Sequence, residues 1–344
     1  MKKQNIINLI KFYAEKNDAA FRNEVVEIAN DFNKNGDPEI GDYLMELIST
    51  TNYYSPQNSY KNLDFLKKTP FINKPLLLPD AIKNDILGII RSAKGQIKIS
   101  KILFQGSPGT GKTESAHQIA RLLDRDLLSV RMEDLVDSHL GQTSKNIVKL
   151  FDEINHLSSQ NIVILFDELD SLVMNRLNSN DLREMGRVTS TFLKELDMLS
   201  EQIIVIATTN LVDSFDKALL RRFDGIISFN RYSKEDLIEI SKSILQTYLK
   251  KSEYSKSDSR LFTKMLKHMD TIPYPGDMIQ IIKIALAFAD DSNEYDYLRR
   301  LYIELNHDEN PSIQKLTAEG YTTREIEVIT KIPKSSVSRK LKEL

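Results

Sequence analysis

The residues with the clearest chemical meaning form one glycine-rich octapeptide in the first third of the chain. It fits the pattern GxxxxGK[ST], follows the apolar run Lys101 to Gln105, and precedes a helical pattern. In such a loop, backbone N–H groups surround phosphates, the lysine reaches the outer phosphates and the hydroxyl binds magnesium. A chance glycine-rich turn is the alternative. The predicted phosphate-binding residues are Gly106, Ser107, Pro108, Gly109, Thr110, Gly111, Lys112 and Thr113.

A second candidate site is a pair of carboxylates that follows the apolar run Ile162 to Phe166. Parallel strands deliver functional side chains at their C-terminal ends. Asp167 can therefore hold magnesium together with Thr113, while Glu168 polarises the attacking water as general base. The alternative is that the two acids open a helix and interact with its dipole.

Polar residues at a third strand end complete this set. The apolar run Ile203 to Ala207 leads into Asn210, whose amide is predicted to lie beside the γ-phosphate and orient the water. Arg221 and Arg222 follow, and an arginine supplied by a neighbouring subunit can neutralise charge in the transition state. The alternative for the arginines is a surface pair at the end of a helix.

The elements that must position these residues alternate between strand-like and helical patterns. Apolar runs at 101–105, 127–131, 162–166, 203–207 and 226–229 are separated mostly by helix-length stretches. This alternation predicts an α/β fold, a parallel sheet with helices on both faces. After Asn230 the periodicity is wholly helical, which predicts a small helical domain.

Composition excludes several classes of chemistry. Of 344 residues, 41% are hydrophobic and 28% charged, and the net charge of −2 gives no global attraction to nucleic acid. The lack of cysteine excludes disulfides, thiolate catalysis and cysteine-bound zinc, and the five scattered histidines disfavour a histidine metal site. The longest apolar run is far too short for a membrane span, which favours a cytoplasmic protein without membrane contact.

Taken together, the motifs resemble the AAA family of ring-forming ATPases, within the AAA+ superfamily. The P-loop (Walker A), the Walker B strand, the TTN tripeptide and the stretch from Asp216 to Asp224 (DKALLRRFD) occur in the family's order. Pro275-Gly276-Asp277 is similar to the family's GAD. The resemblance covers roughly Leu76 to Ala289. It implies ATP and Mg²⁺ as cofactors, a helical lid, nucleotide between subunits, and a self-assembled ring, usually a hexamer, that acts on a polypeptide.

The chain also departs from the family pattern. The pore loop, usually aromatic-hydrophobic-Gly, aligns with His139, Leu140 and Gly141, so a smaller imidazole replaces the aromatic residue that would hold substrate. An ordinary exposed loop is the alternative for His139. The family usually has RPGRFD where this chain has adjacent arginines, which leaves open whether Arg221 or Arg222 is the main finger.

The C-terminal segment resembles the helix-turn-helix of resolvase-type recombinases. Two helices, a tight turn and a third helix are expected, although the family's turn glycine is Lys331 here. In that resemblance, the residues that face DNA are Ser335, Ser336, Ser338, Arg339 and Lys340. A helical module that docks on the lid or on a protein is the alternative.

These patterns divide the chain into four parts. The N-terminal periodicity predicts three short helices, followed from Thr51 to about Lys74 by a linker or an extended docking strap. We expect an N-terminal helical recognition module at 1–60, the large nucleotide-binding domain at 61–230, the lid at 231–310 and the helix-turn-helix at 311–344. Two functions fit. In the first, ATP hydrolysis drives remodelling or unfolding of a protein partner, for which a subtilisin-like protease is one candidate. In the second, ATP controls a DNA-associated switch through the C-terminal module.

Overall fold

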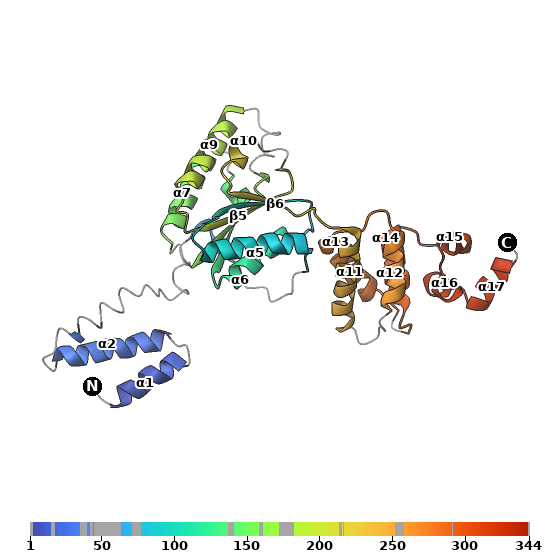
Figure 1. The fold of residues 1–344 in the computed structure, drawn as a ribbon, viewed down its shortest axis with the longest axis horizontal. Coiled ribbons are helices and arrows are strands. Elements are labelled where there is room, and N and C mark those ends of the chain that lie inside the picture. Colours follow the sequence, from blue (N-terminus) through green and yellow to red (C-terminus); the bar gives the residue numbers. More distant parts are fainter. Residues whose placement is uncertain are drawn as a thin grey trace. The chain divides into compact units, whose positions relative to one another are not determined.

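The computed structural model (Figure 1) divides into two units, residues 1–67 and 68–344. The residues that the structure describes are 3–14, 18–34, 40–41, 44, 63–70, 77–136, 141–157, 161–171, 182–212, 215, 217–251, 258–290 and 292–342.

The first unit contains two of the three helices that the N-terminal periodicity predicts, α1 (Lys3–Ala14) and α2 (Asp18–Lys34). They pack together through Tyr13 and Phe21, whose ring centroids are 6.3 Å apart, and Asn8 donates a hydrogen bond to Glu24. The third predicted helix and most of the expected linker lie outside the described residues.

The sheet has six strands in the order β1-β3-β4-β5-β2-β6. Its pairs β2–β5, β2–β6, β3–β4 and β4–β5 are parallel. All five predicted strands are present within two residues of their expected bounds, and the short β1 was not predicted. The strands are β1 (Lys67–Lys68), β2 (Lys101–Gln105), β3 (Asp126–Arg131), β4 (Ile162–Asp167), β5 (Ile204–Thr209) and β6 (Gly225–Ser228).

Helices cover both faces of this sheet, which explains why the middle residues of its central strands are apolar on both faces. Helices α5 and α6 cover one face and α7 and α9 the other (Figure 1). In β4, Val163 and Leu165 belong to the core with α5 and α6, whereas Phe166 packs against Phe151 of α7 and Phe192 of α9. The helices are α5 (Asp80–Lys94), α6 (Lys112–Leu122), α7 (Gln142–Asn155), α9 (Leu182–Met198), the short α10 (Lys217–Leu220) and the 3-10 turn η1 (Met132–Leu135).

The predicted helical region after residue 230 consists of α11 (Lys234–Leu249), α12 (Ser259–His268), α13 (Pro275–Ala287) and α14 (Asp296–Asn306). A capping box between Ser233 and Asp236 starts α11. These four helices form the lid. The structure therefore confirms the predicted mixed α/β fold with a helical lid.

The C-terminal segment forms the three expected helices, α15 (Ile313–Ala318), α16 (Thr323–Thr330) and α17 (Lys334–Lys342). Lys331, in the tight turn before α17, has a φ of +59°, the left-handed conformation that usually favours glycine. The core is continuous from the lid into these helices as far as Val337. Two ion pairs add to this packing, Lys264 with Glu325 at 2.8 Å and Lys331 with the buried Asp296 at 2.9 Å. In the described part of the chain no helix is long and apolar enough to cross a membrane.

Candidate nucleotide site

The glycine-rich loop connects β2 to α6 in a conformation that only glycine adopts easily. Gly106, Gly109 and Gly111 have φ angles of +149°, +74° and +91°. The side-chain oxygen of Asn230 accepts a hydrogen bond from the backbone N–H of Ser107 at 2.8 Å. A Cβ on Gly106 would lie only 2.9 Å from that oxygen. The loop is therefore held by the residues that follow β6, and its first glycine cannot be replaced without displacing that contact.

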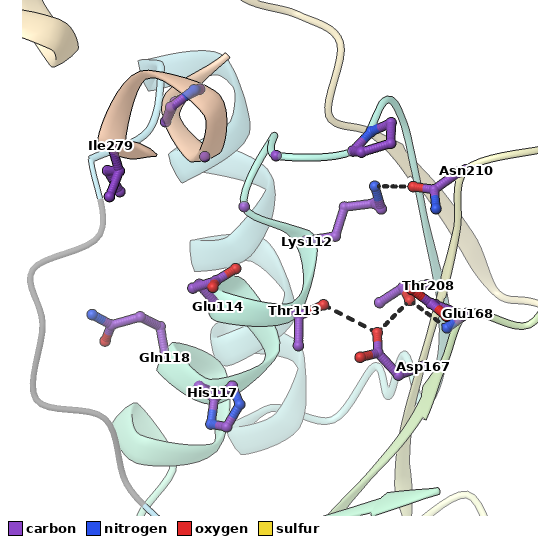
Figure 2. A pocket seen from close by; sticks show the side chains of 15 residues that line it. Lys112, Thr113, Glu114, His117, Gln118, Asp167, Glu168, Thr208, Asn210 and Ile279 are labelled. Carbon is purple, nitrogen blue, oxygen red and sulfur yellow. Dashed lines mark hydrogen bonds between the residues drawn. The ribbon is translucent and has the colours of Figure 1, made fainter. Parts of the chain in front are cut away.

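Lys112 carries the cation of this loop. Its Nζ donates hydrogen bonds to the carbonyl oxygens of Gly106 and Ser107 at 2.7 and 2.9 Å and to Oδ1 of Asn210 at 2.7 Å. Burial lowers the pKa of Lys112, while the nearby carboxylate of Asp170 favours the charged form. The predicted phosphate lysine and the predicted water-orienting amide thus touch directly (Figure 2).

Asp167 ends β4 and is bound by two hydroxyl groups. Oγ1 of Thr113 donates to Asp167 Oδ1 at 3.0 Å, and Oγ1 of Thr208 donates to the same oxygen at 2.6 Å (Figure 2). Among the described residues, no group of three or more His, Cys, Asp or Glu could hold a metal alone. Magnesium commonly takes one or two carboxylates together with substrate phosphates and water, so Thr113 and Asp167 fit its preferences beside a bound nucleotide. There magnesium would neutralise charge on the phosphate oxygens.

Glu168 follows in a strained backbone conformation. Its φ is +55°, which costs a non-glycine residue about 1–3 kcal/mol and persists where surrounding contacts enforce it. Its N–H donates to Oγ1 of Thr208 at 3.0 Å, and the N–H of Leu169 donates to the carbonyl oxygen of Thr208 at 2.8 Å. The turn brings the exposed Glu168 to the wall of the same cavity as Asp167.

These residues line a cavity of about 420 Å³ that the lid closes on one side. Pro275, Gly276 and Ile279 of α13 contribute to its wall. The N–H of Gly276 donates to the carbonyl oxygen of Gly109 at 2.9 Å, and a Cβ on Gly276 would lie 2.6 Å from the Cα of Gly109. The lid thus touches the phosphate loop backbone to backbone, at a point where a side chain on Gly276 would collide with the loop.

A second link between lid and loop is the hydroxyl of the half-buried Tyr232, which donates to the carbonyl oxygen of Thr110 at 2.7 Å. Its ring packs edge-on against Tyr274 at 5.6 Å, directly before α13. Burial raises the pKa of Tyr232, so the hydroxyl stays protonated and remains a donor at neutral pH.

The two arginines follow α10 and differ in their surroundings. Nη1 of Arg222 is 3.1 Å from Oδ2 of Asp197 on α9, whereas Arg221 is exposed and has no ion pair among the residues that the structure describes. Neither lines the cavity. The carboxylate of Asp224 accepts hydrogen bonds from the N–H groups of Ser100 and Lys101 at 2.8 and 2.9 Å, which fixes the segment to the start of β2.

The other predicted site residues lie elsewhere or outside the described residues. His139 and Leu140 belong to the latter group, and Gly141 caps the start of α7 with a φ of +78°. Ser335, Ser336, Ser338, Arg339 and Lys340 are all on α17. The sequence alone assigns no role to several residues that the structure places in or against the site, among them Thr208, Asn230, Tyr232 and Gly276. Of these, Thr208 and Gly276 lie in sequence motifs, the TTN tripeptide and the GAD-like tripeptide.

A glycine-rich loop between a parallel strand and a helix, with a carboxylate at the end of a second strand, defines the class of P-loop nucleotide-binding domains. The model of the ATPase family associated with various cellular activities (AAA) matches residues 102–231. This segment of the chain is an AAA family ATPase domain.

Known proteins are similar to this region. An uncharacterized AAA family ATPase of Sinorhizobium fredii, y4kL, is 39% identical over 132 residues, which are 38% of this chain and 39% of that protein. The peroxisomal ATPase PEX6 of Yarrowia lipolytica is 36% identical over 163 residues, 43% of this chain and 16% of that protein. The chain thus spans less than half the length of these relatives. The crystal structure of the FIGL-1 AAA domain in complex with ADP aligns with a TM-score of 0.54 over 75% of this chain and 91% of that one. At 18% identity this likeness shows the fold alone.

Proposed function

We propose that the chain hydrolyses ATP to ADP and phosphate at the cavity between α6 and α13. The observation that carries the proposal is the convergence of three strand ends on one space. The loop after β2 provides Lys112 and Thr113, β4 provides Asp167 and Glu168, and Asn210 follows β5. The loop binds the phosphates, Thr113 and Asp167 hold magnesium, Glu168 accepts a proton from water, and Asn210 orients that water.

The proposal is tested first at Lys112. Lys112→Ala should weaken ATP binding about 10- to 100-fold, because charge-assisted hydrogen bonds are worth about 1.5–3 kcal/mol. Calorimetric titration with ATP and Mg²⁺ measures the affinity, and Lys149→Ala, an exposed lysine on α7, is the matched control. If the Lys112→Ala protein binds ATP with wild-type affinity, the loop is not the phosphate-binding site that we propose.

We further propose that hydrolysis drives the remodelling of a protein partner by a self-assembled ring. Support comes from the AAA domain and from Arg221. This arginine is exposed and lies outside the nucleotide cavity of its own chain, so its charge could act on a nucleotide bound by a neighbouring subunit. Analytical ultracentrifugation of Glu168→Gln with ATP should show a defined oligomer, and affinity capture by that form should retain the partner. A chain that stays monomeric with ATP at micromolar concentration would contradict the ring.

A DNA-associated switch is the second candidate, favoured by the exposed Arg339 and Lys340 on the last helix. Phosphate contacts release counterions, so binding should weaken with salt at a log-log slope of about −0.9 per contact. The double variant Arg339→Ala/Lys340→Ala removes two cations and should therefore make the slope of log affinity against log salt concentration shallower by up to about 2. Fluorescence anisotropy with duplex DNA measures it, with Lys149→Ala as control. No binding of the ATP-bound protein at about 50 mM salt, where such contacts are strong, would favour docking on protein instead.

A further inference from the structure

We propose that Thr208 is a positioning residue that fixes the magnesium-binding carboxylate of Asp167 and the backbone of Glu168 together. The inference rests on the proposed function, because it assigns a role within the same site. Thr208 is 2% exposed. Its Oγ1 donates to Asp167 Oδ1 at 2.6 Å and accepts from the N–H of Glu168 at 3.0 Å, while its carbonyl oxygen accepts from the N–H of Leu169 at 2.8 Å.

The position of Thr208 explains why a side chain is needed here. The regular pairing of β4 with β5 ends at Phe166 and Ala207. Two residues after Phe166, Glu168 turns the chain with a φ of +55°. The hydroxyl of Thr208 continues the connection between the strands across this turn. It supplies the partner for a backbone N–H that the ladder no longer pairs.

A hydroxyl makes both contacts through a single atom. One O–H group donates a single hydrogen bond and still accepts others through its lone pairs. Valine has nearly the same shape as threonine, but it would leave the N–H of Glu168 and Oδ1 of Asp167 without this partner. Serine would keep both bonds.

The arrangement also determines which carboxylate oxygen faces other partners. Thr113 and Thr208 both donate to Oδ1 of Asp167, so Oδ2 takes neither of these two bonds. A carboxylate held by two hydroxyls loses little freedom when it joins a magnesium coordination sphere. Thr208 therefore favours magnesium binding by preorganisation rather than by contact with the ion or the nucleotide.

The experiment compares Thr208→Val with Thr208→Ser and with Thr263→Val. Thr263 lies on α12 and donates to the carbonyl oxygen of Ser259, so its replacement reports the general effect of losing a threonine hydroxyl. Calorimetry measures the affinity for ADP with Mg²⁺ and with EDTA, and steady-state assays give kcat and KM for ATP. The loss of a hydrogen bond to a charged group changes an equilibrium on the order of tenfold.

We expect Thr208→Val to reduce the gain in ADP affinity from Mg²⁺ about tenfold, with unchanged affinity in EDTA and a larger effect on kcat than on KM. Thr208→Ser and Thr263→Val should behave like the wild type.

If Thr208→Val melts at a lower temperature but responds normally to Mg²⁺, the role is structural and the inference is wrong. It is equally wrong if Thr208→Ser is as impaired as Thr208→Val. Thr208→Ala replaces the valine variant if that fails to fold. If the wild-type protein has no ATPase activity, the proposed function is wrong. The effect of Mg²⁺ on ADP affinity, measured by calorimetry, would still test the role of Thr208.

Discussion

Arg221→Ala should lower the ATP turnover number by about 10³-fold or more, the range in which arginine fingers act. The residue follows α10, is exposed and forms no ion pair in the described part of the chain. Its charge is therefore available to a nucleotide held by a neighbouring subunit, where it would neutralise the charge that develops on the transferred phosphoryl group. Arg222, by contrast, is paired with Asp197 at 3.1 Å.

Arg222→Ala is the matched comparison and should cost less than about tenfold in turnover, because an exposed ion pair contributes at most about 1 kcal/mol. Steady-state rates at saturating ATP and Mg²⁺ measure both variants, with sedimentation to show that each still assembles. Wild-type turnover in Arg221→Ala would mean that the pair only terminates a surface helix. If Arg222→Ala loses more turnover than Arg221→Ala, Arg222 is the arginine finger instead of Arg221.

Mixing experiments show whether the arginine acts on a neighbouring subunit. Arg221→Ala and Glu168→Gln chains should each be nearly inactive alone, yet some interfaces of a mixed oligomer combine an intact Glu168 with an intact Arg221. Partial recovery of ATPase activity on mixing is therefore expected. Mixed oligomers as inactive as their parents would show that Arg221 does not act in trans.

The sheet could be predicted from sequence because its strands are buried on both faces. Such strands appear as uninterrupted apolar runs, and residues 162–166 are all buried in the structure. The residues that line the candidate nucleotide site could be named for a related reason, since Lys112, Asp167 and Asn210 stand at the C-terminal ends of strands or in motifs of fixed spacing. Their roles stay predictions. The sequence placed the end of β5 two residues early, at Ala207 rather than Thr209. The apolar pattern stops before Thr208 and therefore gives no sign of its contact with β4.

What could not be predicted depends on contacts between distant segments. Nothing in the local pattern around Tyr232 shows that its hydroxyl reaches Thr110, 122 residues away. The backbone contact between Gly109 and Gly276 is equally invisible, because a glycine in a helix start has many possible causes. The boundary expected at residue 310 reflects a change in sequence pattern, and that pattern carries no sign that one hydrophobic core extends from the lid to Val337.

Glu168→Gln is expected to bind ATP with wild-type affinity and to hydrolyse it at least about 10²-fold more slowly, within the range of general-base catalysis. The exchange keeps the shape of the side chain and the left-handed backbone that Thr208 holds. It removes only the negative charge that accepts a proton from water. Because Asp167, Thr113 and Lys112 are untouched, magnesium and phosphate binding should remain.

The matched control is Glu201→Gln, which removes an exposed carboxylate just before β5. This position is at the N-terminal end of the strand, whereas the site is at the C-terminal ends. Its turnover should equal that of the wild type. Calorimetry gives the affinities, and phosphate release gives the rates. If Glu168→Gln turns over normally, the proton is accepted elsewhere. If it loses ATP affinity as well, Glu168 contributes to binding rather than to the chemical step, because a base that acts only in the transition state leaves ground-state binding unchanged.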